Sequence, residues 1–228
     1  MVVGNGLIAS AFLEDYSKDD KFIIFASGVS NSLETNLQEF EREKNLLIKI
    51  LNQNKEKHIV YFTSFIDNDE RKRNYISHKE EMVKIIRSSK NYYTILKLPQ
   101  VMGNSKNSHT LINYLVNHIQ NKNQITVYKN VYKAIIDVDD VKKIVDILIK
   151  KWNDKNTFVE FSYIEKISVY KLVKLLEKIL KKPADVNIID AYSYDLPNPS
   201  LAVIYILKHL NIKPKGYTKK VLKKYINK

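Results

Sequence analysis

Apolar and polar positions follow two different patterns along this chain. Nearly continuous apolar runs occupy residues 21–26, 58–62 and 93–98, whereas residues 34–52 and 75–89 carry apolar side chains at every third or fourth position. Short runs without polar alternation are typical of strands buried on both faces of a sheet, and the longer spacing is typical of amphipathic helices. Because the two kinds of segment alternate, the pattern predicts an α/β fold with a parallel sheet covered by helices on both faces.

The remaining pattern extends this alternation to both ends of the chain. We expect a short strand at residues 2–3, a helix at 7–16, later strands near 125–128 and 157–161, and helices near 109–121, 140–152, 169–181, 199–210 and 217–226. No repeat and no low-complexity linker interrupts the series. With 228 residues, the chain is long enough to bury a full hydrophobic core.

A glycine-rich turn lies between the first expected strand and the first expected helix. Its sequence, Gly4-Asn5-Gly6-Leu7-Ile8-Ala9, has the G-x-G-x-x-A spacing of a dinucleotide-binding turn. The first glycine permits a sharp turn, the second lets a pyrophosphate approach the backbone, and the small third residue permits close packing of helix on strand. Phosphate groups would then bind the free N–H groups at the helix N-terminus.

Composition and charge narrow the class of protein. The absence of cysteine excludes disulfides, zinc–thiolate sites and thiol nucleophiles, and the five histidines lack metal-ligand spacing, so we expect no metal site. The formal net charge of +13 indicates either binding to nucleic acid or a membrane surface, or a compositional bias that places lysines on solvated helix faces. Because the lysines are spread along the chain, we favour the second interpretation, with some benefit for anionic substrates, and expect no nucleic-acid or membrane partner.

The chain shows no apolar run of transmembrane length and no signal-peptide segment ahead of Gly4. We therefore expect a cytoplasmic protein.

Tyr75 and Lys79 are candidates for proton transfer. They are four positions apart on an expected helix, so they share one of its faces. An adjacent ammonium stabilises a phenolate, which makes proton transfer between the tyrosine and a sugar hydroxyl or ketone feasible near neutral pH. A hydroxyl side chain at the end of a neighbouring strand, here Ser64, could orient the same substrate oxygen.

The order of these parts resembles a known family. A glycine-rich turn, a strand ending Ala26-Ser27-Gly28, a strand ending Thr63-Ser64 and a Tyr-x-x-x-Lys helix resemble the extended short-chain dehydrogenase/reductases, in particular the NAD-dependent sugar-nucleotide epimerases, dehydratases and reductases. Residues 96–103 (LKLPQVMG) look like the family's L-R-x-P-x-V-x-G segment, and residues 132–140 (YKAIIDVDD) look like its R-x-F-I-x-V-x-D segment. Residues 168–173 (SVYKLV) look like the start of the helix that follows the family's penultimate strand. The resemblance therefore covers nearly the whole chain.

The resemblance implies an enzyme that uses NAD or NADP to reduce or epimerise a nucleotide-activated 4-keto sugar for surface polysaccharide synthesis. Tyr75 would be the acid/base, Lys79 would hold the nicotinamide ribose, and Ser64 would bind the reacting oxygen, with Thr63 as the alternative because the strand-end register is open. The implied cofactor-binding residues are Gly4, Asn5, Gly6, Leu7, Ile8, Ala26, Ser27, Gly28, Thr63 and Pro99. The implied substrate-binding residues are Asn107, His109 and Lys133, the last at a position where the family usually has arginine.

The resemblance also implies how the chain is organised. A Rossmann-like core would span residues 1–103, and a substrate-binding lobe, interleaved with the last core strands, would span residues 104–228 as part of one compact unit. A homodimer is compatible with this organisation.

The N-terminal half departs from the family pattern. Only 16 positions separate Gly6 from Phe22, and Ser64 and Tyr75 are only 11 positions apart. If the strand at residues 22–25 is the family's fourth, its usual second and third strands are absent, together with the acidic residue that holds the adenosine ribose. If it is the second strand, Ser27 and nearby lysines would meet the ribose or a 2′-phosphate and favour NADP. We favour the fourth-strand interpretation.

Three functions therefore remain open. The first is the NAD(P)-dependent sugar-nucleotide enzyme. The second is a catalytically inactive Rossmann-like module that binds a nucleotide, a sugar or a protein partner. The third is nucleic-acid binding, which would weaken steeply with salt. We favour the enzyme.

Overall fold

The computed structural model describes residues 1–66, 69–105, 107–108, 110–152 and 154–226, which fold into two compact units. The first unit contains Met1–Leu98 and Val138–Glu160, and the second contains Pro99–Asp137 and Phe161–Lys228. The chain therefore enters the second unit, returns to complete the first, and enters the second again.

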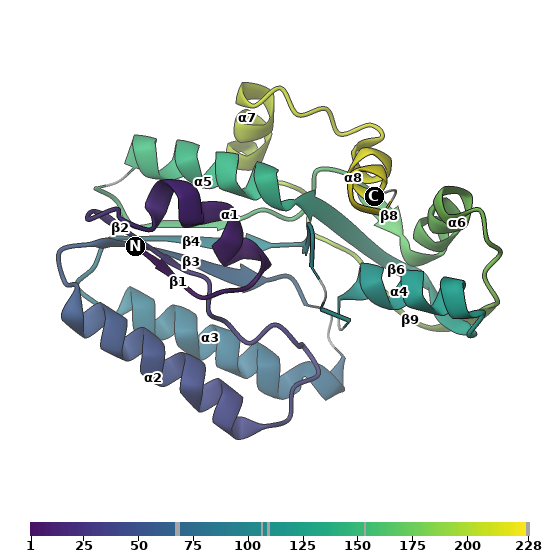
Figure 1. The fold of residues 1–228 in the computed structure, drawn as a ribbon, viewed down its shortest axis with the longest axis horizontal. Helices are drawn as coiled ribbons and strands as arrows, with labels where there is room; N and C mark the ends of the chain where they lie inside the picture. The colour runs from purple at the N-terminus through teal and green to yellow at the C-terminus, as the bar shows by residue number, and fades with distance from the viewer. Residues whose placement is uncertain (67–68, 106, 109, 153, 227–228) are drawn as a thin grey trace. The chain divides into compact units, whose positions relative to one another are not determined.

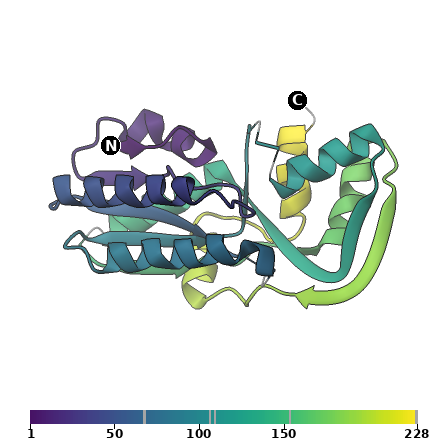
Figure 2. The same ribbon diagram turned by 90° about the horizontal axis from the view of Figure 1, so that it is seen from below.

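The first unit is built on a parallel sheet of five strands. In spatial order these are β1 (Val2–Val3), β2 (Phe22–Phe25), β3 (His58–Ser64), β4 (Tyr93–Leu98) and β7 (Thr157–Glu160). Figure 1 shows α1 (Leu7–Tyr16) and α5 (Val138–Trp152) on one face, with α2 (Leu37–Gln53) and α3 (Arg73–Arg87) on the other. Figure 2 shows α2 and α3 side by side. A short 3-10 helix, Glu70–Lys72, leads into α3.

Burial explains why these strands read as continuous apolar runs. Ile23 and Ile24 point to opposite faces of β2, and neither is exposed to solvent. The face toward α2 and α3 forms a core cluster with Ile59, Tyr61 and Ile95. Two-sided burial therefore confirms the α/β class that the sequence pattern predicts.

The strand order decides between the two interpretations of β2. The usual dinucleotide-binding sheet has the order 3-2-1-4-5-6, with the first strand between the second and the fourth. Here β1 is at one edge of the sheet formed by the described residues, and β2 lies between β1 and β3. This is the order expected when β2 takes the fourth position, so the second-strand interpretation is wrong, and the usual second and third strands are absent from the described part of the sheet.

The second unit is organised around one long strand, β6 (Ile125–Asp137). Its C-terminal half pairs in parallel with β5 (Gln100–Met102) and antiparallel with β8 (Lys166–Ser168), and its N-terminal half pairs in parallel with β9 (Val186–Tyr194). The helices of this unit are α4 (Leu111–Asn121), α6 (Val169–Leu180), α7 (Leu201–His209) and α8 (Tyr217–Ile226). Side chains of Thr110, Ser168 and Ser200 cap the first three of them.

Candidate functional site

The glycine-rich turn packs directly on the end of β2. Gly4 has a φ of +125°, and a Cβ at this position would lie 2.4 Å from the carbonyl oxygen of Ala26 and 2.9 Å from the backbone nitrogen of Ser27. Only glycine fits both the backbone conformation and the space. The Ala26 N–H donates to the carbonyl oxygen of Val3 at 2.8 Å, so the β1–β2 pairing continues as far as the start of the glycine-rich turn. The structure thus brings Gly4, Ala26 and Ser27 into contact.

Gly6 has a different role in the same turn. It is the N-cap residue of α1, with a φ of −80°, and a Cβ there would meet nothing within 4 Å. No side chain of the described residues caps α1, and its first turn, which begins with Leu7 and Ile8, holds no acidic residue. Asn5 and Gly6 are exposed. The residues that precede the first turn of α1 are therefore exposed and leave space beside the backbone of Gly6, as an anion-binding helix N-terminus requires.

The two glycines are expected to respond differently to alanine. Gly4→Ala should lower the free energy of unfolding by at least about 2 kcal/mol, because the new Cβ meets backbone atoms at a φ that alanine avoids. Gly6→Ala is the matched control and should cost at most about 1 kcal/mol, because its Cβ enters open space. Urea denaturation measures both, and equal losses would contradict the close packing of Gly4 on β2.

Tyr75 and Lys79 lie on the buried stripe of α3. This stripe comprises Tyr75, His78, Lys79, Met82 and Ile86, which recur every three or four residues. Tyr75 and Lys79 are each only 5% exposed. Tyr75 packs against Val29 and Phe40, and the Lys79 ammonium nitrogen lies 5.4 Å from the centre of the Tyr75 ring. The structure therefore brings the two residues together, on the face of α3 that is turned toward the protein interior.

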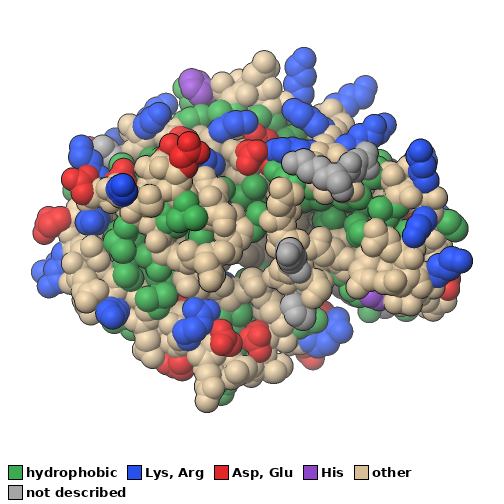
Figure 3. Space-filling model, viewed as in Figure 1, with side chains coloured by type: hydrophobic (Ala, Val, Ile, Leu, Met, Phe, Trp, Pro, Cys, Tyr) green, Lys and Arg blue, Asp and Glu red, His purple; other side chains and the backbone are tan. Residues whose placement is uncertain are grey.

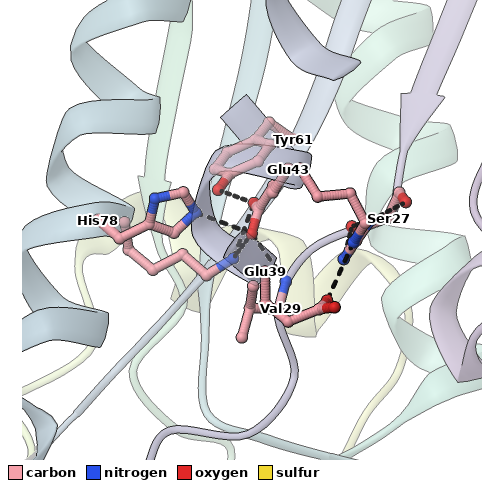
Figure 4. Close-up of polar contacts among 8 residues, drawn as sticks. Ser27, Val29, Glu39, Glu43, Tyr61 and His78 are labelled. Atoms are coloured by element: carbon pink, nitrogen blue, oxygen red, sulfur yellow. Dashed lines mark hydrogen bonds and ion pairs between the residues drawn. The ribbon is translucent and has the colours of Figure 1, made fainter. Parts of the chain in front are cut away.

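A buried carboxylate that the sequence analysis did not identify holds Lys79. Both oxygens of Glu43, on α2, accept hydrogen bonds from the Lys79 ammonium, at 2.9 and 3.0 Å. The Tyr61 hydroxyl donates at 2.9 Å, the Val29 N–H donates at 2.7 Å, and Nε2 of His78 lies 3.0 Å away (Figure 4). Glu43 has no solvent exposure. The carboxylate thus joins α2, β3, α3 and the segment after β2.

These contacts keep Glu43 ionised. Burial alone would raise the pKa of Glu43, but the hydrogen bond to His78, the charge of Lys79 and the hydrogen bond from Val29 lower it to about 2. Burial first, and then the neighbouring carboxylate of Glu43, raise the pKa of Tyr61 well above its ordinary value. Tyr61 therefore stays a neutral donor to an ionised carboxylate.

The segment after β2 is shaped around this ion pair. A Cβ on Gly28 would lie 2.8 Å from the Lys79 ammonium nitrogen and 3.2 Å from a Glu43 oxygen, so glycine leaves the ammonium room. The half-buried residue Ser27 meets α2 instead, because Nη1 of Arg42 lies 3.4 Å from both its carbonyl and hydroxyl oxygens (Figure 4). Arg42 also pairs with Glu39 at 3.0 Å. Two cations thus lie beside consecutive residues of one loop.

Thr63 and Ser64 are the last two residues of β3. They lie at the carboxyl ends of the parallel strands, where the glycine-rich turn also lies. Thr63 pairs in register with Lys97 and is 8% exposed, whereas Ser64 pairs with Leu98 and is half-buried. No hydrogen bond joins either hydroxyl to Tyr75 among the residues that the structure describes. Ser64 is the more accessible of the two candidates for binding a substrate oxygen.

The other predicted residues belong to the second unit, whereas Tyr75 and Lys79 belong to the first. Pro99 is buried and is the single residue that separates β4 from β5 in the sequence. The Asn107 carbonyl accepts from the Thr110 hydroxyl at 3.3 Å and from the Asn113 amide at 2.8 Å, which fixes the loop before α4. Lys133 lies on β6, with its ammonium nitrogen 4.8 Å from the centre of the Tyr194 ring. His109 lies outside the described residues.

Two further searches cover the described part of the chain. No helix there is both long and apolar enough to cross a bilayer. No cluster of three or more carboxylate or imidazole side chains in that same part could hold a metal ion.

Comparison with known proteins identifies the fold. No protein-family model matches the chain, and no curated protein sequence is significantly similar to it. The structure is similar to UDP-N-acetylglucosamine 4-epimerase from Methanobrevibacter ruminantium, solved with UDP-N-acetylmuramic acid, at 16% identity and a TM-score of 0.66, covering 96% of this chain and 80% of that one. The chain thus has the Rossmann-like α/β fold of this epimerase.

Two other epimerases have similar structures. UDP-glucose 4-epimerase from Thermus thermophilus, solved with NAD, matches over 96% of this chain and 80% of its own, at 12% identity and a TM-score of 0.65. UDP-N-acetylglucosamine 4-epimerase from Bacillus cereus matches over 98% of this chain and 93% of its own, at 10% identity and a TM-score of 0.68. At such low identity, these similarities establish the fold alone.

Proposed function

We propose that this chain is an NAD(P)-dependent reductase or epimerase that acts in the cytoplasm on a nucleotide-activated sugar, in the synthesis of a surface polysaccharide precursor. The observation that carries the proposal is the position of Tyr75 and Lys79. Lys79 lies beside Gly28 and Tyr75 packs against Val29, both in the segment that follows the carboxyl end of β2, in a fold shared with nucleotide-sugar epimerases. Open α/β sheets bind their ligands outside the carboxyl ends of their strands.

The residues fit part of a nicotinamide dinucleotide. The open N-terminus of α1 at Gly6 suits the pyrophosphate, and the ammonium of Lys79 beside Gly28 suits the nicotinamide ribose. The adenosine end is less well provided for, because β1 is an edge strand of the described sheet and no second strand carries an acidic residue beside it. We therefore expect the dinucleotide to be held mainly by its pyrophosphate and nicotinamide halves.

In this proposal each side chain has a defined task. Hydride transfer would be the chemistry that a dinucleotide supplies when it is bound between the glycine-rich turn and Lys79. Tyr75 gives its hydroxyl proton to, or takes a proton from, the sugar oxygen whose carbon changes oxidation state. Ser64 hydrogen-bonds the same oxygen, and Lys79 donates to the dinucleotide. Burial of Tyr75 and Lys79 limits the access of bulk water to the proton-transfer step.

The charge distribution supports an anionic substrate for the second unit. This unit carries 18 of the 38 Lys and Arg residues but only 6 of the 25 Asp and Glu residues, so nearly all of the net positive charge belongs to it. Figure 3 shows Lys and Arg side chains around the surface over α6 and α8. The density of basic residues is similar in the two units. The second unit has the larger net positive charge because it contains fewer Asp and Glu residues. A positive field of this kind attracts a diphosphate.

Cofactor binding tests the proposal directly. Isothermal titration of the full chain with NADH and with NADPH should give a dissociation constant below about 1 mM for at least one of them. Gly6→Ala should weaken that binding, because its new Cβ occupies the space where the pyrophosphate approaches the backbone. Lys84→Met, which removes an exposed cation from α3, is the control and should leave binding unchanged. Failure of both dinucleotides to bind at millimolar concentration would overturn the enzyme assignment.

One observation favours a second candidate function. Glu43 neutralises the charge of Lys79, which is the charge that should assist Tyr75. A catalytically inactive module that binds a nucleotide sugar or a protein partner could keep such a pair for structural reasons alone. The same titration separates the two candidates, since this module predicts no binding of NADH or NADPH at millimolar concentration.

A further inference from the structure

The Glu43 carboxylate is surrounded by four donor groups from three segments of the first unit. They are the Val29 N–H after β2, the Tyr61 hydroxyl on β3, and the His78 ring and Lys79 ammonium on α3. A carboxylate has about four lone-pair positions, so these contacts occupy it completely. Because it is fully buried as well, Glu43 cannot itself touch a substrate. Any effect that it has on a reaction must act through the residues that it holds.

Lys79 is the partner through which Glu43 could act. An ammonium has three N–H donors, and the two oxygens of Glu43 lie at hydrogen-bond distance from it, at 2.9 and 3.0 Å. Among the residues that the structure describes, no other group accepts a hydrogen bond from this ammonium, so one donor remains for a ligand. The missing side chain of Gly28 leaves space next to the nitrogen, because a Cβ there would come within 2.8 Å of it. The ammonium is thus fixed in position with one donor still available.

We propose that Glu43 is a positioning residue: it holds the Lys79 ammonium beside Gly28 so that one N–H is presented to a hydroxyl group of the bound dinucleotide. This inference rests on the proposed function. A lysine has a flexible four-carbon side chain, and without a fixed partner it would sample several positions. Since the pair is neutral overall, Lys79 acts here as an oriented hydrogen-bond donor more than as a point charge.

A purely structural role is the competing explanation, and stability alone does not account for the pair. A buried ion pair is often no more stabilising than well-packed apolar side chains of the same volume. The stripe of α3 that holds Lys79 continues with Met82 and Ile86, so an apolar residue would suit its surroundings. A positioning role predicts that Glu43 affects only ligands that reach Lys79, whereas a structural role predicts an equal effect on all ligands.

Two ligands separate these explanations. NADH contains the nicotinamide ribose, and ADP ends before it. Glu43→Gln should weaken NADH binding about tenfold, because one charge-assisted hydrogen bond is lost, and should change ADP binding less than twofold. Glu81→Gln is the matched control: it removes an ion pair of 2.7 Å to Lys44 that joins the same two helices at the surface. This control should change the affinity for neither ligand.

Lysine reactivity provides a test that requires no cofactor. In the wild-type protein, acetic anhydride should modify Lys79 at least about tenfold more slowly than the exposed Lys84 on the same helix, because Lys79 is buried and two hydrogen bonds to Glu43 hold its ammonium in place. In Glu43→Gln this protection should be lost, whereas Glu81→Gln should retain it. Peptide mass spectrometry reads both sites in one sample.

The outcomes distinguish failure of this inference from failure of the proposed function. Equal weakening of NADH and ADP in Glu43→Gln, or unchanged protection of Lys79, would overturn the positioning role while leaving the enzyme assignment intact. If the wild type binds no NADH, the enzyme assignment and the dinucleotide part of this inference fail together, and the labelling shows whether Glu43 still holds Lys79. Should Glu43→Gln fail to fold, Glu43→Asp serves both tests, because it keeps the charge but withdraws it by one methylene.

Discussion

Tyr75→Phe is expected to lower kcat at least about 100-fold on an NDP-4-keto sugar, because it removes the only hydroxyl proposed to transfer the proton. The fold should tolerate the change. Tyr75 packs against Val29 and Phe40 through its ring, and phenylalanine keeps these contacts. The measurement is NADH or NADPH oxidation followed at saturating cofactor, with candidate nucleotide sugars supplied one at a time.

The control for this experiment is Tyr92→Phe. Tyr92 is 54% exposed just before β4, so its hydroxyl takes no part in the buried cluster, and kcat should stay unchanged. Binding of NADH to Tyr75→Phe should also persist, because Lys79 and the glycine-rich turn are intact. Undiminished turnover by Tyr75→Phe would show that another group moves the proton, and the assigned chemistry would be wrong.

The fold was predictable where the surroundings of an element are uniform along its length. Residues 23–25 and 59–62 are buried, so each reads as an unbroken apolar run and forms most of β2 or the middle of β3. The strand expected near residues 125–128 is much longer than predicted, because β6 continues to Asp137. Exposed polar side chains at Lys129 and Asn130 interrupt its apolar pattern. Its partner β9 comes from about 60 residues later, beyond the reach of local periodicity.

The residues of the candidate site also differ in how far the sequence could predict them. The glycine spacing at residues 4–9 and the Tyr-x-x-x-Lys spacing are local, so the sequence was sufficient to select these residues. The Glu43–Lys79 pair joins positions 36 apart on two helices, and spacing alone could not reveal it. One signal was nevertheless present. Glu43 lies three positions after Phe40 and four before Leu47, so a charged residue occupies the buried stripe of α2. Such a residue indicates a buried partner.

This buried pair leads to the second large effect. Lys79→Met is expected to lower the free energy of unfolding by about 3–5 kcal/mol, because the Glu43 carboxylate would remain ionised and buried without its cation. The ion pair between Lys44 and Glu81 at the surface connects the same helices but should contribute far less to the free energy of unfolding, because solvent screens its charges. Urea denaturation at neutral pH measures the stability of Lys79→Met and of Glu81→Gln, which removes the surface pair. Lys84→Met controls for the loss of a lysine from α3.

A double variant identifies the cause of this loss. In Lys79→Met with Glu43→Gln, no charge of the pair remains, so most of the stability lost in Lys79→Met should return. The sign of the pH dependence provides an independent check. Because the folded protein holds the pKa of Glu43 at about 2, below its ordinary 4.5, the stabilisation is present above pH 4.5 and is lost as the pH falls toward 2. The double variant should lack this contribution. If Lys79→Met is as stable as Lys84→Met, Glu43 does not depend on Lys79 for its charge.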